Sequence, residues 1–336
     1  MTQAFNTRWT ADRAWDWYRS QSWLCGFNYV TSTAINSTEM WQSDTFDPGT
    51  MDRELGWANK AGFNTCRVFL QYLVWQHDPE GLTDRIDHFL QIASRHGIST
   101  MFCLFDDCAF AGRQPYLGKQ DEPVPGVHNS GWTPSPGHER VVDRTVWARL
   151  EDYVTSVVSR FSQDARVVAW DLYNEPGAAD MGDQSLPLLC EVFQWARGVK
   201  PQQPLTAGIW HPDLKALNET ITEQSDILTF HNYDDLETLR QQVDDLKAYG
   251  YPLVCTEWMA RTRDSLFETH LPFLKQESIG CYSWGLVNGK SQTHFPWGWP
   301  RGASEPELWF HDIFHPDGTL YNETEVEAIR HFGQTD

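Results

Sequence analysis

The sequence predicts a single (β/α)8 TIM barrel as one domain over residues 1–336, and three observations support this fold class. Short apolar runs alternate with stretches of helical pattern, and eight such runs occur along the chain. Runs of this kind are typical of parallel strands that are buried on both faces. Eight strand–helix units in about 300 residues fit one barrel, and no Gly/Ser-rich or Pro-rich linker divides the chain.

The predicted strands are short apolar segments bounded by polar or turn-forming residues. An apolar run of about four to eight residues has the length of a buried strand. The predicted strands cover residues 23–29, 65–70, 100–105, 167–174, 204–210, 227–233, 252–258 and 280–286.

Amphipathic segments between these strands predict the helices of the outer layer. Gly62 lies just past the first such segment, and we expect Thr83 to cap the second and Gly97 to end it. The predicted helices cover residues 51–62, 83–97, 143–161, 235–250, 264–278 and 323–332.

Two connections, residues 106–142 and 287–321, are too long to be simple turns. They follow the third and the eighth strand, so they lie at the C-terminal face, where barrel enzymes carry their chemistry. Loops of this length usually have a function, such as forming lids or binding walls. Both contain proline and bulky aromatic residues, so we expect them to hold their shape and to wall one end of an open cleft.

The charge of the chain excludes several classes of partner. Its 26 basic and 46 acidic residues give a net charge of −20, which excludes nucleic acid and anionic membrane surfaces. No apolar run approaches the ~20 residues that span a bilayer. Hydrophobic residues make up 40% of the chain and aromatic residues 14%, so a sizeable core is available and disorder is excluded. This composition suits a neutral substrate.

The seven cysteines show neither CxxC spacing nor a short disulfide scaffold. Residues 1–21 contain no apolar core and no small-residue cleavage site, so no secretory signal is predicted. We therefore expect a reduced cytoplasmic protein, with a processed form that has lost its signal as the alternative. Five cysteines lie in apolar runs, where a free thiol acts as a small hydrophobe: Cys25, Cys66, Cys103, Cys255 and Cys281.

Two glutamates stand at predicted strand ends. Glu175 closes the fourth run in the stretch WDLYNEPG, and Glu257 closes the seventh. For Asn-Glu-Pro alone, a strand end followed by a polar turn is the simpler interpretation. Both glutamates point into the same barrel mouth, however, and facing carboxyl groups are costly unless their surroundings set different protonation states. Glycoside hydrolysis uses that arrangement, because one carboxylic acid protonates the leaving oxygen and one carboxylate attacks or activates water.

Other polar and aromatic residues lie at the same end of the barrel. Arg67 is within the second run and needs a buried carboxylate partner, for which Glu257 is available. His231 and Tyr233 are two residues apart on the sixth run and so share a face. Taken singly, each is more simply a core or rim residue, but their convergence indicates a site. Two tryptophans also stand at or near strand ends, Trp210 and Trp284.

In this order the motifs resemble glycoside hydrolase family five, a family of retaining (β/α)8 glycosidases, from Trp23 to Phe332. The resemblance implies a retaining β-glycosidase that acts by double displacement. The residues that carry it are Arg67, Asn174-Glu175-Pro176, His231, Tyr233, Glu257 and Trp284.

The resemblance also implies a role for each residue. Glu175 would be the general acid/base and Glu257 the nucleophile. Asn174 would donate a hydrogen bond to the 2-hydroxyl of the sugar, and His231 would orient the site.

The remaining matched residues would serve Glu257 and the sugar. Arg67 and Tyr233 would hold and charge-stabilise Glu257, and Trp284 would form the sugar-stacking floor. With Arg67 beside it, Glu257 should have a lowered pKa, whereas Glu175 faces a carboxylate and should have a raised one. We expect the two carboxyl groups about 5 Å apart, the separation found in retaining enzymes.

The chain departs from the family at the end of the third strand. The family usually carries a histidine there, whereas this chain has Phe105-Asp106-Asp107. The departure affects the innermost sugar contacts, and Asp106 and Asp107 become candidates for binding substrate. Trp210 and Trp297 are further candidates, because aromatic faces stack on pyranose rings. The tryptophans in or near predicted mouth loops, some of which serve packing, are Trp41, Trp132, Trp210, Trp258, Trp297 and Trp299.

Two other classes of protein are alternatives. A metal-dependent barrel hydrolase would need a ligand cluster, and the spacing of His211, His231, Asp106 and Glu257 matches no known signature, so no metal is expected. Gly-rich phosphate loops are absent, and no cofactor is expected. A sugar-binding barrel without catalysis is disfavoured because both glutamates remain.

A neutral oligosaccharide is the expected partner, and the sequence carries no indication of an oligomeric state. A walled cleft accepts a chain end, so we expect exo action on short β-1,4-linked oligosaccharides. Some β-mannosidases of the resembling family act in this way, with Man-β-1,4-GlcNAc among their substrates. The alternative is an endo-β-1,4-glycanase acting on mannan, xylan or glucan.

Overall fold

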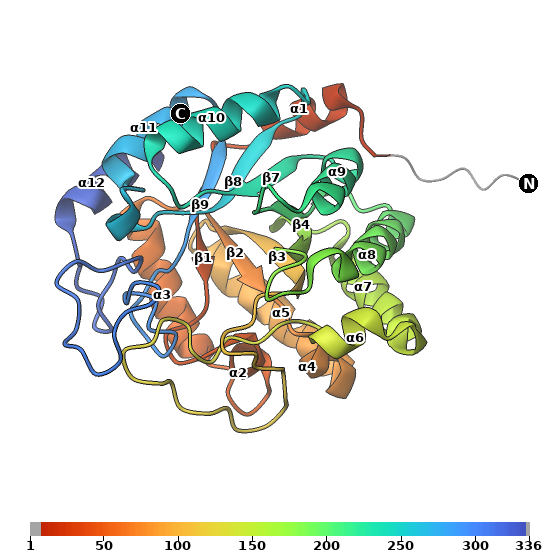
Figure 1. The fold of residues 1–336 in the computed structure, drawn as a ribbon, viewed down its shortest axis with the longest axis horizontal. Coiled ribbons are helices and arrows are strands. Elements are labelled where there is room, and N and C mark those ends of the chain that lie inside the picture. The colour runs from red at the N-terminus through yellow and green to blue at the C-terminus, as the bar shows by residue number, and fades with distance from the viewer. Residues whose placement is uncertain (1–7, 334–336) are drawn as a thin grey trace, which may run out of the picture.

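The computed structural model describes residues 8–333, and its centre is a parallel sheet of nine strands rolled into a barrel (Figure 1). Neighbouring strands follow the order β5-β4-β3-β2-β1-β9-β8-β7-β6. The predicted (β/α)8 fold class is confirmed, and a strand lies within or over each predicted run. The strands are β1 (Cys25–Tyr29), β2 (Thr65–Phe69), β3 (Ser99–Asp106), β4 (Val167–Asn174), β5 (Leu205–Thr206), β6 (Gly208–Ile209), β7 (Leu228–His231), β8 (Leu253–Trp258) and β9 (Gly280–Ser283).

The ninth strand arises because the fifth predicted strand is interrupted at Ala207. Its first half, β5, pairs with β4, and its second half, β6, pairs with β7, so the barrel closes at this point of the chain. Side chains bridge the interruption. Thr206 Oγ1 donates to the Ile227 carbonyl at 2.9 Å, and the Leu205 N–H donates to Asp226 Oδ2 at 3.0 Å.

Helices form the outer layer of the barrel (Figure 1). Those that match predicted segments are α3 (Pro48–Ala61), α5 (Pro79–Arg95), α7 (Trp147–Phe161), α10 (Leu236–Lys247), α11 (Phe267–Gln276) and α12 (Glu323–Gly333). Those not predicted individually are α1 (Ala11–Arg19), α2 (Ser37–Trp41), α4 (Tyr72–His77), α6 (His138–Val142), α8 (Leu186–Val199) and α9 (Lys215–Gln224).

Helix α5 begins one turn earlier than predicted. Pro79 occupies its first turn, where a missing N–H costs nothing, and Asp78 caps it by accepting from the Gly81 N–H at 3.0 Å. Thr83 is therefore inside the helix and donates to the Pro79 carbonyl at 2.7 Å. The prediction that Thr83 caps this helix was wrong, because the proline and the aspartate already define the start.

The other predicted helix ends are largely as expected. Gly62 follows α3 with a left-handed φ of 103°, and Gly97 follows the end of α5 with a φ of 67°. The helix predicted over residues 143–161 begins only at Trp147, because the residues before it form a 3-10 turn (Arg144–Val146).

The barrel interior changes from apolar to polar along its axis. At the N-terminal end, apolar side chains of several strands pack together with Tyr18 of α1, which closes that end. Nearer the C-terminal end, Asn28, Arg67 and Asp171 are buried inside the barrel. Buried charges are costly without partners, so this half of the barrel is a site rather than a core. All seven cysteines are free thiols, and the five in apolar runs are buried, as predicted.

The two long loops pack against each other beside the C-terminal end of the barrel (Figure 1). Residues 106–142 contain only the short helix α6, and residues 287–321 contain no helix. The Asn129 N–H donates to the Ser291 carbonyl at 2.7 Å, which joins the two loops directly. The two loops therefore form one connected wall.

Within residues 8–333, no helix combines the length and apolar character needed to cross a membrane. The predicted single domain includes residues 1–7 and 334–336, which lie outside the described part of the chain. Residues 1–7 also carry part of the segment from which the absence of a secretory signal was predicted.

Candidate active site

Arg67 is the centre of a buried polar network at the C-terminal end of the barrel. Its Nη1 donates to Glu257 Oε1 at 2.8 Å, the partner expected from the sequence, and to Asn28 Oδ1 at 2.8 Å. Its Nε and Nη2 lie 2.8 and 2.7 Å from Asp171 Oδ2, and Nη2 also donates to Asn174 Oδ1 at 2.6 Å. Burial alone would lower the pKa of Arg67, but the charges of Asp171 and Glu257 raise it, so the guanidinium stays charged.

Asp171 was missed in the sequence interpretation. It lies on β4 within the apolar run and is fully buried. The signal was present, because a carboxylate inside an apolar strand requires a buried cation. Asp171 therefore shares the charge of Arg67 with Glu257.

Glu257 lies near the end of β8 with both carboxylate oxygens bonded. Oε1 accepts from Arg67, and Oε2 accepts from the Tyr233 hydroxyl at 2.7 Å. Burial raises the pKa of Glu257, and the neighbouring charge of Glu175 adds to this, although nearby cationic and hydrogen-bonding groups oppose it. The predicted lowering of this pKa was wrong, because Arg67 is shared with Asp171 and the loss of water outweighs its effect.

Glu175 follows β4 directly and has a left-handed backbone with a φ of 42°. Its Oε1 lies 2.7 Å from His231 Nδ1, and its Oε2 accepts from the Cys108 thiol at 2.8 Å. The pKa of Glu175 is raised as predicted, but burial rather than the facing carboxylate is the main cause. Burial also lowers the pKa of His231 to about 4, so this imidazole is neutral at neutral pH.

The two glutamates and His231 converge on one point. One oxygen of Glu175, one oxygen of Glu257 and one nitrogen of His231 lie within 4.8 Å of one another. These atoms are suitable ligands for a divalent cation. However, the guanidinium of Arg67 already pairs with Glu257, and its positive charge would repel a cation at this point. The larger cluster considered from the sequence is not assembled, because the oxygens of Asp106 accept hydrogen bonds elsewhere.

Asp106, the last residue of β3, supports Asn174 rather than facing the cavity. It accepts from Asn174 Nδ2 at 2.8 Å, from Trp132 Nε1 at 2.7 Å and from the Cys108 N–H at 2.8 Å. Burial raises the pKa of Asp106 to about 8. Its position makes it a support for the amide of Asn174, which does face the cavity.

Asp107 turns away from the cavity. Its side chain accepts from the Gly177 N–H at 2.7 Å and from the Ser185 hydroxyl. It thereby anchors the turn that carries Glu175. The expectation that Asp106 and Asp107 contact substrate is corrected, because both carboxylates find buried donors on the neighbouring β4 unit and its loops.

A cavity of about 730 Å³ opens above these groups. Arg67, Asp106 and Asp107 lie behind its lining. The candidate residues that line it are Asn174, Glu175, Trp210, His231, Tyr233, Glu257, Trp284 and Trp297. The lining residues that the sequence interpretation did not assign to the site include Cys108, Phe110, His128, Asn129 and several residues of α10.

Trp284 and Trp132 form an aromatic wall on the side of β1, β2 and β3. Trp284 follows β9, and its ring meets those of Phe69 and Trp132 edge to face, with centroids 5.7 and 5.9 Å apart. The hydrogen bond from Trp132 to Asp106 fixes the indole in place. We refer to Trp132 and Trp284 as the aromatic wall.

Trp297, which is 44% exposed, is held by both long loops. Its Nε1 donates to His128 Nε2 at 3.2 Å, and His128 Nδ1 lies 2.8 Å from the Phe295 carbonyl. The Trp297 ring meets the Tyr233 ring edge to face at 5.1 Å. The loop wall therefore touches the side chain that holds Glu257.

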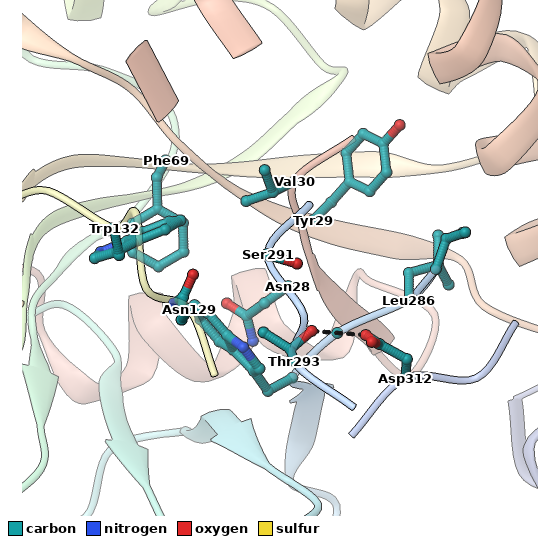
Figure 2. A pocket seen from close by; sticks show the side chains of 13 residues that line it. Asn28, Tyr29, Val30, Phe69, Asn129, Trp132, Leu286, Ser291, Thr293 and Asp312 are labelled. Carbon is teal, nitrogen blue, oxygen red and sulfur yellow. Dashed lines mark hydrogen bonds between the residues drawn. The ribbon is translucent and has the colours of Figure 1, made fainter. Parts of the chain in front are cut away.

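A much smaller pocket of about 20 Å³ lies behind the aromatic wall (Figure 2). Its lining includes Asn28 of β1 and the pair Thr293 and Asp312, whose side chains are hydrogen-bonded at 2.8 Å (Figure 2). The volume suits about one water molecule. This small pocket shares Asn129, Trp132 and Trp284 with the lining of the large cavity, so the two adjoin at the aromatic wall.

A (β/α)8 barrel with two facing glutamates beneath an aromatic-lined cavity is the arrangement of a barrel glycoside hydrolase. Comparison with known families agrees. The sequence profile described as Cellulase (glycosyl hydrolase family 5) matches residues 28–290. The chain belongs to glycosyl hydrolase family 5, as its motifs suggested, and is a glycoside hydrolase. No match was found among curated protein sequences.

Solved structures share this fold. A single-substitution variant of GH5_18 from Streptomyces cattleya, in complex with Manb1-4GlcNAc, has a TM-score of 0.62 at 14% identity, covering 94% of this chain and 82% of that one. An exo-beta-1,4-mannosidase from Opitutaceae bacterium strain TAV5 has a TM-score of 0.63 at 17% identity, covering 93% and 60%. The endo-beta-1,4-mannanase from Thermotoga petrophila has a TM-score of 0.60 at 14% identity, covering 94% and 77%. Identities this low establish the fold alone.

Proposed function

We propose that this glycoside hydrolase retains the anomeric configuration, with Glu257 as nucleophile and Glu175 as general acid/base. The observation that carries the proposal is a distance: an oxygen of Glu175 lies within 4.8 Å of an oxygen of Glu257. Retaining enzymes hold their carboxyl groups about 5–5.5 Å apart, whereas inverting enzymes leave about 6.5–9.5 Å for a water molecule.

The surroundings of the two groups support this division of roles. Glu257 accepts from Arg67 and Tyr233, so the proton of the pair resides on Glu175. Attack of Glu257 on the anomeric carbon forms a glycosyl ester while the leaving oxygen takes the proton of Glu175. Glu175 then deprotonates a water molecule, which hydrolyses the ester and restores both groups. Neutralising Glu257 in the ester lowers the pKa of Glu175, as this second step requires.

The shape of the cavity supports removal of one sugar from a chain end. The aromatic wall bounds the large cavity beside the proposed position of the reacting sugar. Space remains on the side of Glu175, toward Trp210, where the protonated leaving group departs. A site closed beyond the reacting sugar accepts the non-reducing end of a chain.

A β-1,4-linked mannoside is the substrate that we favour. The structural neighbours include an exo-beta-1,4-mannosidase and a protein bound to Manb1-4GlcNAc. The tryptophans of the cavity suit the apolar faces of pyranose rings, and a net charge of −20 suits a neutral sugar.

Two measurements test this function. NMR of the first product formed from p-nitrophenyl β-mannoside should show β-mannose before mutarotation, and an inverted first product would exclude the double displacement. Manno-oligosaccharides labelled at the reducing end should lose mannose from the non-reducing end from the earliest time point.

Endo-β-1,4-glycanase action on mannan, xylan or glucan is the second candidate. It is favoured by the cavity volume of about 730 Å³, which exceeds the need of one sugar, and by the fold shared with an endo-beta-1,4-mannanase. A rapid fall in the viscosity of a polysaccharide solution would establish endo action and exclude exo action, while leaving the roles of the two glutamates unchanged.

A further inference from the structure

One face of helix α10 lines the cavity beyond the two glutamates. Five of its residues, at helical spacing, contribute to the lining: Thr238, Gln241, Gln242, Asp245 and Leu246. At 1.5 Å per residue, this stretch of helix extends the lining by about 12 Å. A wall of this length is longer than one pyranose ring.

A second part of the lining comes from the end of β6 and the segment that follows it. Its residues are Ile209, Trp210, His211 and Pro212. Trp210 lies next to Glu175 in space, because its Nε1 donates to the carbonyl of Pro176 at 3.1 Å. The space between this segment and α10, which we call the α10 groove, therefore begins where the leaving oxygen would be protonated. It lies on the side of the cavity away from the aromatic wall.

The α10 groove presents mainly uncharged hydrogen-bonding groups. Gln241 donates to Asp245 at 3.1 Å, which leaves further acceptor positions on Asp245 and both donor and acceptor positions on Gln241. Arg263 lines the cavity but is paired with Asp234, so no uncompensated cation is offered to an anionic ligand. Amides, a hydroxyl and the ring of Trp210 match the hydroxyls and apolar faces of neutral sugars.

We propose that the α10 groove binds the leaving part of the substrate as a chain of at least two neutral sugar units. This proposal rests on the proposed exo-glycosidase function and adds to it a preference for substrate length. The enzyme acts on trisaccharides and longer chains in preference to disaccharides and aryl glycosides.

The first test is a length series with the wild-type enzyme. Values of kcat/KM are measured for p-nitrophenyl β-mannoside, mannobiose, mannotriose and mannotetraose. We expect a rise of about tenfold from mannobiose to mannotriose, because a second leaving sugar adds contacts in the groove. Equal values for mannobiose and mannotriose would overturn the proposal.

A steric block tests the position of the groove. Thr238→Trp places a large ring in it, and kcat/KM for mannotriose should fall about tenfold more than kcat/KM for the aryl mannoside. Glu237→Trp is the matched control, since Glu237 is exposed on the same helix but does not line the cavity. The control should keep the wild-type ratio of the two values, and thermal unfolding followed by circular dichroism verifies that both variants are folded. An unchanged ratio in folded Thr238→Trp would place the leaving sugars elsewhere.

Two neighbouring aspartates of α10 provide a second variant and its matched control, with a smaller expected effect. Asp245 lines the groove, whereas Asp244 is exposed on α10 outside it. Asp245→Ala should raise the inhibition constant of mannobiose, as a product analogue, by about threefold to tenfold through loss of hydrogen bonds to the sugar. Asp244→Ala should leave it unchanged, and equal effects of the two changes would contradict a specific groove.

Two failures are distinguishable in these experiments. If the wild-type enzyme cleaves neither the aryl mannoside nor any manno-oligosaccharide, the proposed function is wrong and the groove proposal falls with it. If it cleaves them at rates independent of chain length and of Thr238→Trp, the proposed function stands and only the groove proposal is overturned.

Discussion

The surroundings of Glu257 and Glu175 are built in opposite ways. Glu257 lies within β8, and its Oε1 is held by Arg67, a charged side chain of a barrel strand. Glu175 stands one residue past the end of β4 on a left-handed backbone, and its partners are the thiol of Cys108 and the neutral imidazole of His231. Glu257 therefore lies beside a charged partner on a barrel strand. Glu175 lies among neutral partners, one of which, Cys108, comes from a loop.

The difference supports the two roles that we propose for these glutamates. Burial raises the pKa of both glutamates, so burial alone cannot distinguish them. The partners distinguish them, because a fixed cation favours the carboxylate while neutral partners allow a proton to remain. The region with Arg67 suits a nucleophile, and the buried region of Glu175, where no cation among the described residues is bonded to the carboxyl group, suits a proton donor.

Removing each glutamate in turn should have the largest effect. Glu257→Ala and Glu175→Ala should each lower kcat for unactivated oligosaccharides by about 10⁴-fold or more, because each deletes a group that acts on the reacting atoms in the proposed mechanism. Steady-state kinetics with mannotriose measures the loss.

Azide then distinguishes the two variants. In Glu175→Ala, azide should attack the glycosyl-enzyme formed from an aryl glycoside and yield a β-glycosyl azide. In Glu257→Ala, it should replace the nucleophile and yield the α-glycosyl azide. The reverse pattern would interchange the two roles.

Removing Arg67 should have the next largest effect, which is on the stability of the folded protein. Arg67→Met leaves Asp171 and Glu257 buried without their cation, which should lower the free energy of unfolding by about 3–5 kcal/mol. Urea denaturation measures the change. Arg263→Met is the matched control, because its ion pair with Asp234 is half exposed and should contribute about 0–1 kcal/mol. Similar losses in the two variants would refute the special role of the buried network.

The pH dependence of stability should sharpen the comparison at Glu175. Its pKa in the folded protein is raised, so its contribution to stability is complete below the pKa of the unfolded chain and is lost as pH rises through the folded value. Glu175→Gln keeps the shape without ionising. Its free energy of unfolding relative to wild type should therefore increase from about pH 4 to pH 7, by about 1.4 kcal/mol per unit of pKa shift.

Urea denaturation at several pH values measures this trend. Glu237→Gln, at an exposed position on α10, should show none. A relative stability of Glu175→Gln that decreases toward neutral pH would show that the folded protein prefers the ionised carboxylate.

The smallest expected effect concerns Cys108. Its thiol donates to Glu175 and so favours the ionised carboxylate, which lowers the pKa of that group. Cys108→Ala should shift the basic limb of the kcat/KM profile upward by about 0.5 pH unit, the equivalent of one weak hydrogen bond. Cys108→Ser retains a donor and should shift it less. A downward shift in Cys108→Ala would mean that the thiol mainly excludes water.

The sequence was sufficient for the fold and for the convergence of several polar residues at one end of the barrel. A strand's apolar run shows where it ends, and parallel strands end at one face, so Arg67, Glu175 and Glu257 could be brought together without coordinates. The point at which the barrel closes could not be predicted from the sequence. The run over residues 204–210 is continuously apolar, although the sheet breaks it at Ala207.

The orientations of side chains just past strand ends were beyond sequence reasoning. Asp106 and Asp107 have the residue type of sugar ligands, but local backbone geometry and buried donors direct them behind the cavity. Cys108 lies in a long loop without periodicity, so no pattern assigned it to Glu175. The polar face of α10 gave no signal either, because an amphipathic pattern does not distinguish a cavity wall from a solvent-exposed surface.

The interruption at Ala207 has a consequence for local opening of the barrel. β5 and β6 contain two residues each, whereas β3 and β4 contain eight each, so few backbone amides are protected by ladder bonds at the closure point. In deuterium exchange, we expect the amides of residues 205–209 to exchange well before those of β3 and β4. Because Trp210 and His211 follow directly, local opening of the barrel would reach the Glu175 side of the cavity before it reached the aromatic wall.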